Sequence, residues 1–151
     1  MRLIALACLL ALSLVACRKA EPPAPSRPPG EVYSAPEGQY LFIKPPTWRT
    51  LVLPESVPPG IAGATSEVRW NLNVESERPR SLLTLVTFPP EAWAAYTPDS
   101  GAVEVVFQDD RRVIAAMPAD PNPYEPGSEG SGRFDALRLP LDTVRARLIV
   151  R

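Results

Sequence analysis

The stretch that decides the fold is EVRWNLNVE at residues 67–75. Its apolar residues, Val68, Trp70, Leu72 and Val74, occupy every second position, and polar residues stand between them. Successive side chains of a β-strand point to opposite faces of a sheet, so this alternation predicts a strand with one buried face and one wet face. Such a strand is typical of an antiparallel sheet.

The segments that follow predict two hairpins. Residues 76–80 form a polar turn, and the more continuously apolar residues 81–88 predict the partner strand. Residues 102–107 alternate again, residues 108–111 indicate a turn, and residues 112–117 predict a second partner strand. We expect two antiparallel sheets to enclose Val68, Trp70, Leu72, Leu85, Val105 and Phe107.

The C-terminal stretch admits two interpretations. Phe134, Leu137, Leu141, Val144 and Leu148 fall at helical spacings of three and four, whereas Pro140 argues against a continuous helix. We favour strands at residues 134–139 and 144–150, which would turn Arg145, Arg147 and Arg151 outward. Further weak strands are predicted at residues 40–44 and 48–53, and one short helix is predicted from Pro90 to Tyr96.

The 20 prolines and 8 glycines interrupt any long helical pattern. Together with the alternating strands they predict an all-β fold, an antiparallel β-sandwich of jelly-roll-like type with one short helix. We expect this domain to span residues 37–151, a length at which a single core is normal.

The N-terminus predicts a cleavable export signal. A positive start at Arg2 is followed by an apolar run over residues 3–15, which is shorter than the roughly 20 residues of a membrane-spanning helix. The run ends in Leu14-Val15-Ala16-Cys17, which resembles the lipobox of bacterial lipoprotein precursors. The resemblance implies that residues 1–16 are removed and that Cys17 is acylated and anchors the chain to a lipid bilayer. The alternative is an ordinary signal peptide that leaves Cys17 as a free thiol.

Residues 17–36 are expected to form the lipidated N-terminus and a proline-rich linker. An extended polyproline conformation of this segment would reach roughly 60 Å. Arg18 stands where lipoproteins retained in the inner membrane have aspartate, so the resemblance implies an outer-membrane location if the source is Gram-negative. Cys8 is lost with the signal peptide, and no disulfide is therefore expected in the mature chain.

The order of several short segments resembles the galactose-binding-like jelly-roll modules of exported bacterial proteins. These segments, which together cover about residues 48–151, are 49–54, 66–70, 89–93, 103–107 and 134–142. The resemblance implies a β-sandwich accessory module. Phe134 stands where such modules usually have tryptophan, so a sugar-binding role is not carried over.

The composition excludes several kinds of catalytic site. The chain has no histidine, so serine–histidine–aspartate and cysteine–histidine arrangements cannot form, and the usual zinc and copper sites lack their nitrogen ligand. A serine–lysine pair would have to use Lys44. The closest carboxylate pairs, Glu75 with Glu77 and Asp109 with Asp110, lie at predicted turns, where charges normally face water. We expect no catalytic residues, no cofactor and no metal site.

Three aromatic residues and two arginines are the candidate binding residues. Trp93, Tyr96 and Tyr124, together with Trp48, lie near predicted strand ends or loops, where flat rings can stack on sugars, although such rings also cap sandwiches. Arg145 and Arg147 could bind an anionic glycan or lipid headgroup, or could simply face water on an edge strand.

The loop of residues 118–132 is a further candidate contact region. It offers Asp120, Asn122, Glu125 and Glu129, which are oxygen ligands of the kind that calcium takes. Its spacing matches no calcium-binding loop, and residues 127–132 indicate a flexible linker.

Two classes of function remain. The favoured one is a non-catalytic binding or scaffold lipoprotein of the cell envelope that contacts a glycan, peptidoglycan or an envelope protein. The alternative is an envelope enzyme or transport component that uses carboxylates or calcium. Without Arg2 the chain has 15 basic and 17 acidic residues, so no basic field would attract nucleic acid.

Overall fold

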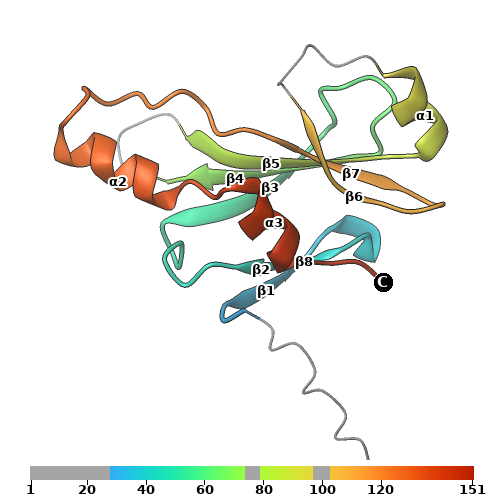
Figure 1. Ribbon diagram of the computed structural model, residues 1–151, viewed down its shortest axis with the longest axis horizontal. Helices are drawn as coiled ribbons and strands as arrows, with labels where there is room; N and C mark the ends of the chain where they lie inside the picture. Colours follow the sequence, from blue (N-terminus) through green and yellow to red (C-terminus); the bar gives the residue numbers. More distant parts are fainter. Residues whose placement is uncertain (1–27, 74–78, 97–102) are drawn as a thin grey trace, which may run out of the picture.

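The computed structural model describes residues 28–73, 79–96 and 103–151, and these residues form two antiparallel sheets (Figure 1). Sheet A has the strand order β1-β2-β8 and sheet B the order β3-β4-β5-β7-β6. The strands are β1 Glu31–Ser34, β2 Leu41–Lys44, β3 Val52–Val57, β4 Ser66–Leu72, β5 Arg80–Phe88, β6 Glu104–Gln108, β7 Val113–Met117 and β8 Leu148–Ile149. The predicted all-β sandwich is confirmed.

Short helices connect and cover the sheets. They are the 3-10 helix η1 Pro36–Gly38 and the α-helices α1 Pro90–Ala95, α2 Glu129–Leu137 and α3 Leu141–Arg147. Helix α1 confirms the helix predicted after Pro90. It lies beside sheet B on the side away from sheet A, whereas α2 and α3 lie beside the sandwich (Figure 1).

Both predicted hairpins are present, and each contains an irregularity. Strand β4 pairs antiparallel with β5, and β6 pairs antiparallel with β7. In the second hairpin Val105 pairs with Ala115 and Phe107 with Ile114, so Val106 is an extra residue on β6. Such a bulge reverses the alternation of side chains beyond it.

Because of the bulge, one residue predicted to lie in the core between the sheets lies on the other face of sheet B. Val106 and Phe107 pack against the core between the sheets, whereas Val105 packs against a second apolar cluster on the other face of sheet B. The expectation that Val105 lies between the sheets is therefore wrong. The predicted positions Val68, Trp70, Leu72 and Leu85 are buried there as expected.

Trp70 is the centre of the core between the sheets. Its ring lies 4.9 Å from that of Tyr33 on β1, 5.0 Å from that of Phe42 on β2 and 5.5 Å from that of Trp48, measured between centroids. Aromatic pairs at these separations stabilise a core beyond the apolar area that they bury. Trp70 therefore joins sheet B to both longer strands of sheet A.

A second apolar cluster covers part of the outer face of sheet B. Val86, Phe88, Val103, Val113 and Ala115 are buried there, and α1 packs over them. The rings of Trp93 and Tyr96 lie 5.2 Å and 5.5 Å from that of Phe88. The outer face is thus closed around the Val86–Phe88 end of β5 and the neighbouring residues of β6 and β7.

The strands favoured at residues 134–139 and 144–150 are wrong, because α2 and α3 occupy most of this stretch. The side-chain oxygen of Ser128 accepts a hydrogen bond from the backbone N–H of Ser131 and caps α2. Pro140 is the residue before α3 and so interrupts no helix. The helical spacing places Phe134 and Val144 in the core, and only Leu148–Ile149 remain a strand.

Two further boundaries differ from expectation. Residues 48–51 form a turn rather than the start of a strand, because Trp48 O accepts from both Leu51 N and Val52 N and the Trp48 indole donates to Leu137 O. Strand β1 lies within residues 17–36, which were expected to be linker. Residues 1–27, with the expected signal peptide and Cys17, lie outside the described residues, as does most of the turn at 76–80.

Gly30, the residue before β1, packs closely against the backbone of β2. Its φ is +154°, and a Cβ atom at this position would lie 1.9 Å from the backbone oxygen of Lys44. We expect Gly30→Ala to lower the free energy of unfolding by about 2–4 kcal/mol in chemical denaturation, because backbone must move to make room.

Gly132→Ala is the matched control. A Cβ atom there would meet nothing within 4 Å, and the residue lies inside α2, so this variant should gain up to about 1 kcal/mol. Equal stability of the two variants would contradict the tight entry at Gly30.

Candidate functional site

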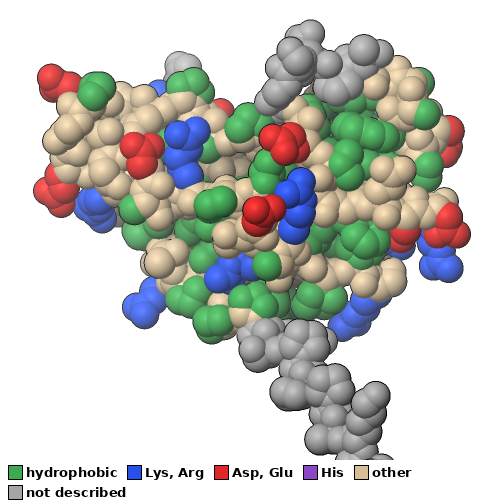
Figure 2. Space-filling view, viewed as in Figure 1, with side chains coloured by type: hydrophobic (Ala, Val, Ile, Leu, Met, Phe, Trp, Pro, Cys, Tyr) green, Lys and Arg blue, Asp and Glu red, His purple; other side chains and the backbone are tan. Residues whose placement is uncertain are grey.

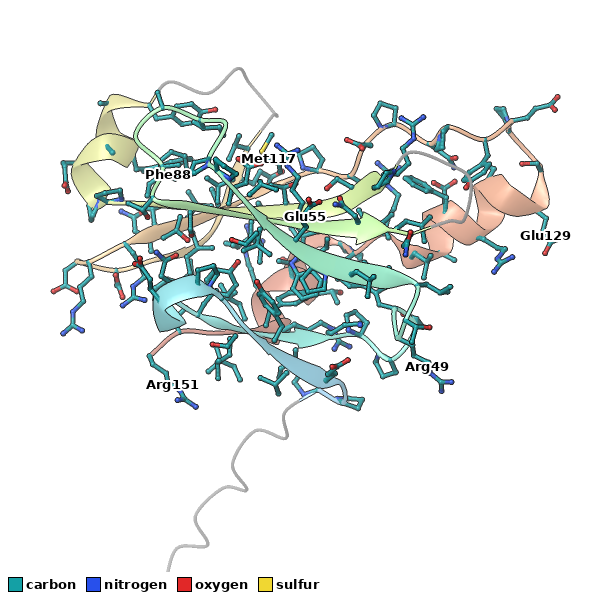
Figure 3. All side chains as sticks on the ribbon, turned by 180° about the vertical axis from the view of Figure 1, so that it is seen from behind. Arg49, Glu55, Phe88, Met117, Glu129 and Arg151 are labelled. Carbon is teal, nitrogen blue, oxygen red and sulfur yellow. The ribbon has the colours of Figure 1, made fainter. Side chains whose placement is uncertain are left out.

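The candidate site is an open polar groove on the outer face of sheet B, here called the outer groove. It has a volume of about 410 Å³ and lies on the part of this face that α1 does not cover. Glu55 and Met117, which both line it, are labelled in Figure 3. The lining residues are Glu55, Glu67, Arg69, Asn71, Pro79, Ser81, Thr84, Met117, Pro118 and Asp120.

The strand pattern places most of these side chains. Val68, Trp70 and Leu72 of β4 point into the core, so Glu67, Arg69 and Asn71 point outward. On β3, Glu55 is the register partner of Arg69 and stands beside it on this face. Over residues 67–71, the polar face predicted for this strand is therefore the floor of the outer groove.

Hydrogen bonds among the lining residues fix the floor. Arg69 Nε donates to Glu67 Oε1 at 2.7 Å, and the backbone N–H of Gly60 donates to Glu67 Oε2 at 2.7 Å. Glu67 is only 3% exposed, and these two bonds satisfy its buried carboxylate. Asn71 Nδ2 donates to Glu55 Oε2 at 2.8 Å. The floor is consequently held in one geometry before any ligand arrives.

Asp120 brings the chain after β7 to the edge of the groove. Its backbone N–H donates to Ser81 O at 2.7 Å, and its Oδ2 accepts from Ser81 N at 2.9 Å. The hydroxyls of Ser81 and Thr84 lie 3.0 Å apart. These contacts extend sheet B past Met117 and add hydroxyl groups to the wall of the groove.

Several polar atoms of the groove make no hydrogen bond within the described part of the chain. They are Glu55 Oε1, Asp120 Oδ1, Asn71 Oδ1 and the two terminal nitrogens of Arg69. Three carboxylates and one guanidinium give the lining a net charge of −2. The groove can thus offer hydrogen bonds of both directions, and its charge favours a neutral or cationic ligand over an anionic one.

The predicted aromatic residues do not form one platform. Trp93 and Tyr96 belong to the segment of α1 and pack against Phe88, whereas Tyr124 packs near α2 with its ring 6.3 Å from that of Phe134. All three side chains are partly buried. A binding role for any of them stays a prediction, and none lines the outer groove.

Arg145 and Arg147 lie on helix α3 and not on a strand face, because the predicted strand is absent. Arg145 Nη1 pairs with Asp142 at 2.9 Å, and its Nη2 donates to the backbone oxygen of Val105 at 3.1 Å. Arg147 Nη1 donates to the backbone oxygens of Pro29 and Ile43, both at 3.1 Å. Both guanidinium groups therefore hold parts of the fold together.

The loop of residues 118–132 is fastened at several points, and residues 127–132 are not a flexible linker because α2 begins within them. Asn122 Nδ2 donates to the backbone and side-chain oxygens of Ser131, and Asn122 Oδ1 accepts from Tyr124 N. Asp120 is engaged with Ser81, and Glu125 and Glu129 are exposed. Over the described residues, no three acidic or cysteine side chains come together as a metal site.

The described residues among the possible catalytic groups named from the sequence do not line the groove. Glu75 and Glu77 fall outside the described residues, and Lys44 pairs with Glu31 at 3.5 Å. The pKa of Asp109 is lowered, first by a hydrogen bond from the backbone N–H of Arg111. Burial raises the pKa of Tyr40 far above its usual range, so this phenol stays neutral in the core.

The outer groove was missed as a site from the sequence, although its polar face was predicted. Glu67, Arg69 and Asn71 could be assigned to a wet face by alternation, but nothing in the sequence shows that Asp120 returns to Ser81, 39 residues earlier in the chain. In comparisons with models of protein families, with curated proteins and with solved structures, the chain matches none.

The hydrogen bonds of Arg147 should contribute to the stability of the fold. Arg147→Met keeps the apolar stem but removes the bonds to Pro29 and Ile43, so we expect thermal and chemical denaturation to show a loss of about 1–2 kcal/mol. Arg138→Met is the control, because its pair with Asp135 is exposed and 3.7 Å long; it should change stability by less than about 0.5 kcal/mol. If both variants were as stable as the unaltered protein, Arg147 would have no structural role and would again be a candidate for ligand binding.

Proposed function

We propose that this protein is a lipid-anchored lipoprotein of the cell envelope whose β-sandwich binds a polar envelope polymer in the outer groove. The observation that carries the binding role is the outer groove itself, an open polar surface whose floor is fixed by its own hydrogen bonds. A preorganised surface loses little conformational freedom when it binds, which favours affinity.

The lining of the groove favours the uncharged sugar backbone of a glycan or peptidoglycan strand over a phosphate-rich polymer. Its unpaired carboxylate and amide oxygens accept from hydroxyl and amino groups, and the Arg69 terminal nitrogens donate to ring or carbonyl oxygens. The net charge of −2 would repel phosphate-rich polymers. An uncharged or amine-bearing chain of sugars or peptides is the chemistry that these groups complement.

The anchor rests on the lipobox-like residues 14–17. Basic side chains also lie on the side of the folded part where the described chain begins, together with the exposed carboxylate of Glu31 on β1. Figure 2 shows Lys and Arg side chains, and no Asp or Glu, along the lower edge of the face in view, near the point where the described chain begins. Arg49 and Arg151, labelled in Figure 3, lie toward this same side. Basic side chains near a membrane surface are attracted by anionic headgroups.

No helix in the described parts of the chain is both long and apolar enough to cross a membrane.

Intact-mass analysis of the membrane fraction tests the anchor. The mature protein should lack residues 1–16 and carry two or three acyl chains on Cys17, whereas Cys17→Ala should accumulate as precursor or leave the membrane. Stable retention of the mature Cys17→Ala chain without acylation would contradict the lipoprotein assignment.

Co-sedimentation with purified peptidoglycan tests the groove. We expect Glu55→Lys to weaken binding by about tenfold or more, because it replaces a carboxylate that would accept hydrogen bonds from the ligand with an ammonium group that can only donate them. Glu55 is exposed, so the fold should tolerate the change.

Glu125→Lys makes the same charge change at an exposed loop position outside the groove and serves as the control. Equal binding by both variants and the unaltered protein would exclude the outer groove as the contact surface. If both variants bound peptidoglycan equally more weakly, the binding would depend on the overall charge of the protein and not on the groove.

A further inference from the structure

A second polar cavity lies at one end of the sandwich, away from the outer groove. This end cavity is an open depression of about 290 Å³ between η1, the end of β5 and the turn that joins β6 to β7. Ligand sites for small molecules begin at roughly this size, so the end cavity suits a small molecule rather than a polymer strand. Its lining is Glu37, Gly38, Gln39, Thr65, Thr87, Phe88, Pro89, Arg111 and Arg112.

Thr87 gives the cavity an unsatisfied polar group. The residue is 3% exposed, and its hydroxyl has no hydrogen-bond partner among the described residues. The neighbouring hydroxyls are engaged, because Thr65 Oγ1 donates to Thr87 O at 3.2 Å and Ser66 Oγ bonds to Gln39 Oε1 at 2.6 Å. Buried hydroxyls are normally paired, so an unpaired one in the wall of a cavity points to a missing partner.

The turn between β6 and β7 presents two arginines to the same cavity. Asp109 Oδ1 accepts from the backbone N–H groups of both Arg111 and Arg112, at 2.9 Å and 2.8 Å, and fixes the turn. The guanidinium of Arg112 is held by the backbone oxygens of Gln39 and Arg151. The guanidinium of Arg111 makes no hydrogen bond or salt bridge within the described part of the chain, although its charge interacts with the Asp109 carboxylate.

The charge and backbone of the cavity agree with an anionic ligand. Two arginines and Glu37 give the lining a net charge of +1, although the Asp109 carboxylate, which holds the turn, interacts with both arginine charges. Glu37 has a φ of +56°, a left-handed conformation that is uncommon outside glycine. Such backbone strain often accompanies binding sites.

We propose that the end cavity binds a small molecule that carries a carboxylate or phosphate group. The oxyanion pairs with the Arg111 guanidinium and accepts the hydrogen bond that the Thr87 hydroxyl cannot give within the chain. This site is independent of the polymer-binding role of the outer groove, because the two cavities share no lining residue.

Calorimetric titration of the mature protein with inorganic phosphate and, separately, with succinate tests the proposal. At least one of the two should bind, and the tighter one identifies the oxyanion. Arg111→Ala should weaken that binding by about tenfold or more, because it removes the charged pair. Arg49→Ala removes an exposed arginine outside the cavity and should leave binding unchanged.

Thr87→Val separates a ligand contact from a structural one. Valine has nearly the same shape but no hydroxyl, so we expect weaker anion binding together with a thermal midpoint that is equal or higher. A lowered midpoint would mean that the hydroxyl already has a structural partner and would overturn the proposal. So would the absence of binding by both anions, or an equal loss in Arg49→Ala.

Discussion

The aromatic contacts of Trp70 are the interaction on which the rest of the structure depends. One ring on β4 touches rings from β1, β2 and the turn after β2, so the two sheets share a single core. Trp48 extends this arrangement, since its indole N–H donates to Leu137 O at the end of α2. The C-terminal helices are therefore fixed by the same cluster that joins the sheets. The outer face of sheet B takes no part in joining the two sheets.

Strand β5 divides that outer face into two halves. Its outward residues change from Ser81 and Thr84 at one end to Val86 and Phe88 at the other. The apolar end requires a cover, and α1 provides it. The polar end needs none, because its groups are bonded to one another or face water. The outer groove exists where the cover of α1 stops, and a single strand sequence thus determines which half of the face is open to a ligand.

The fold could be predicted from alternation wherever one face of a strand was polar. Residues 67–72 were assigned correctly for this reason. Residues 81–88 were predicted from their continuous apolar run, and residues 112–117, of which 113–117 form a strand, as the partner of a hairpin. The helix from Pro90 was predicted because proline is permitted in the first turn. The C-terminal stretch failed because its apolar spacing fits both periods and because Pro140, read as a helix breaker, precedes α3 instead. The bulge at Val106 was missed, because the three consecutive apolar residues Val105, Val106 and Phe107 break the alternation without showing which of them is the extra residue.

The candidate site was less predictable than the fold, because it depends on contacts between distant segments. The polar face of β4 followed from alternation, but the pairing of Asp120 with Ser81 and the approach of the β6–β7 turn to η1 are tertiary facts. Arg145 and Arg147 show the same limit. Exposed arginines suggested an anion site, yet their guanidinium groups bond backbone oxygens of Val105, Pro29 and Ile43.

The edges of the sheets indicate how a polymer would be recognised. A free strand edge invites an added strand from a partner, unless something blocks it. At the β3 edge, Pro54 offers no backbone N–H, and at the β6 edge Arg145 occupies the carbonyl of Val105. Strand β1 has four residues and β8 only two, so neither presents a long edge. Recognition by strand addition is therefore disfavoured at both edges of sheet B. A ligand that lies across the face, in contact with side chains of β3, β4 and β5, is the mode that this arrangement leaves open.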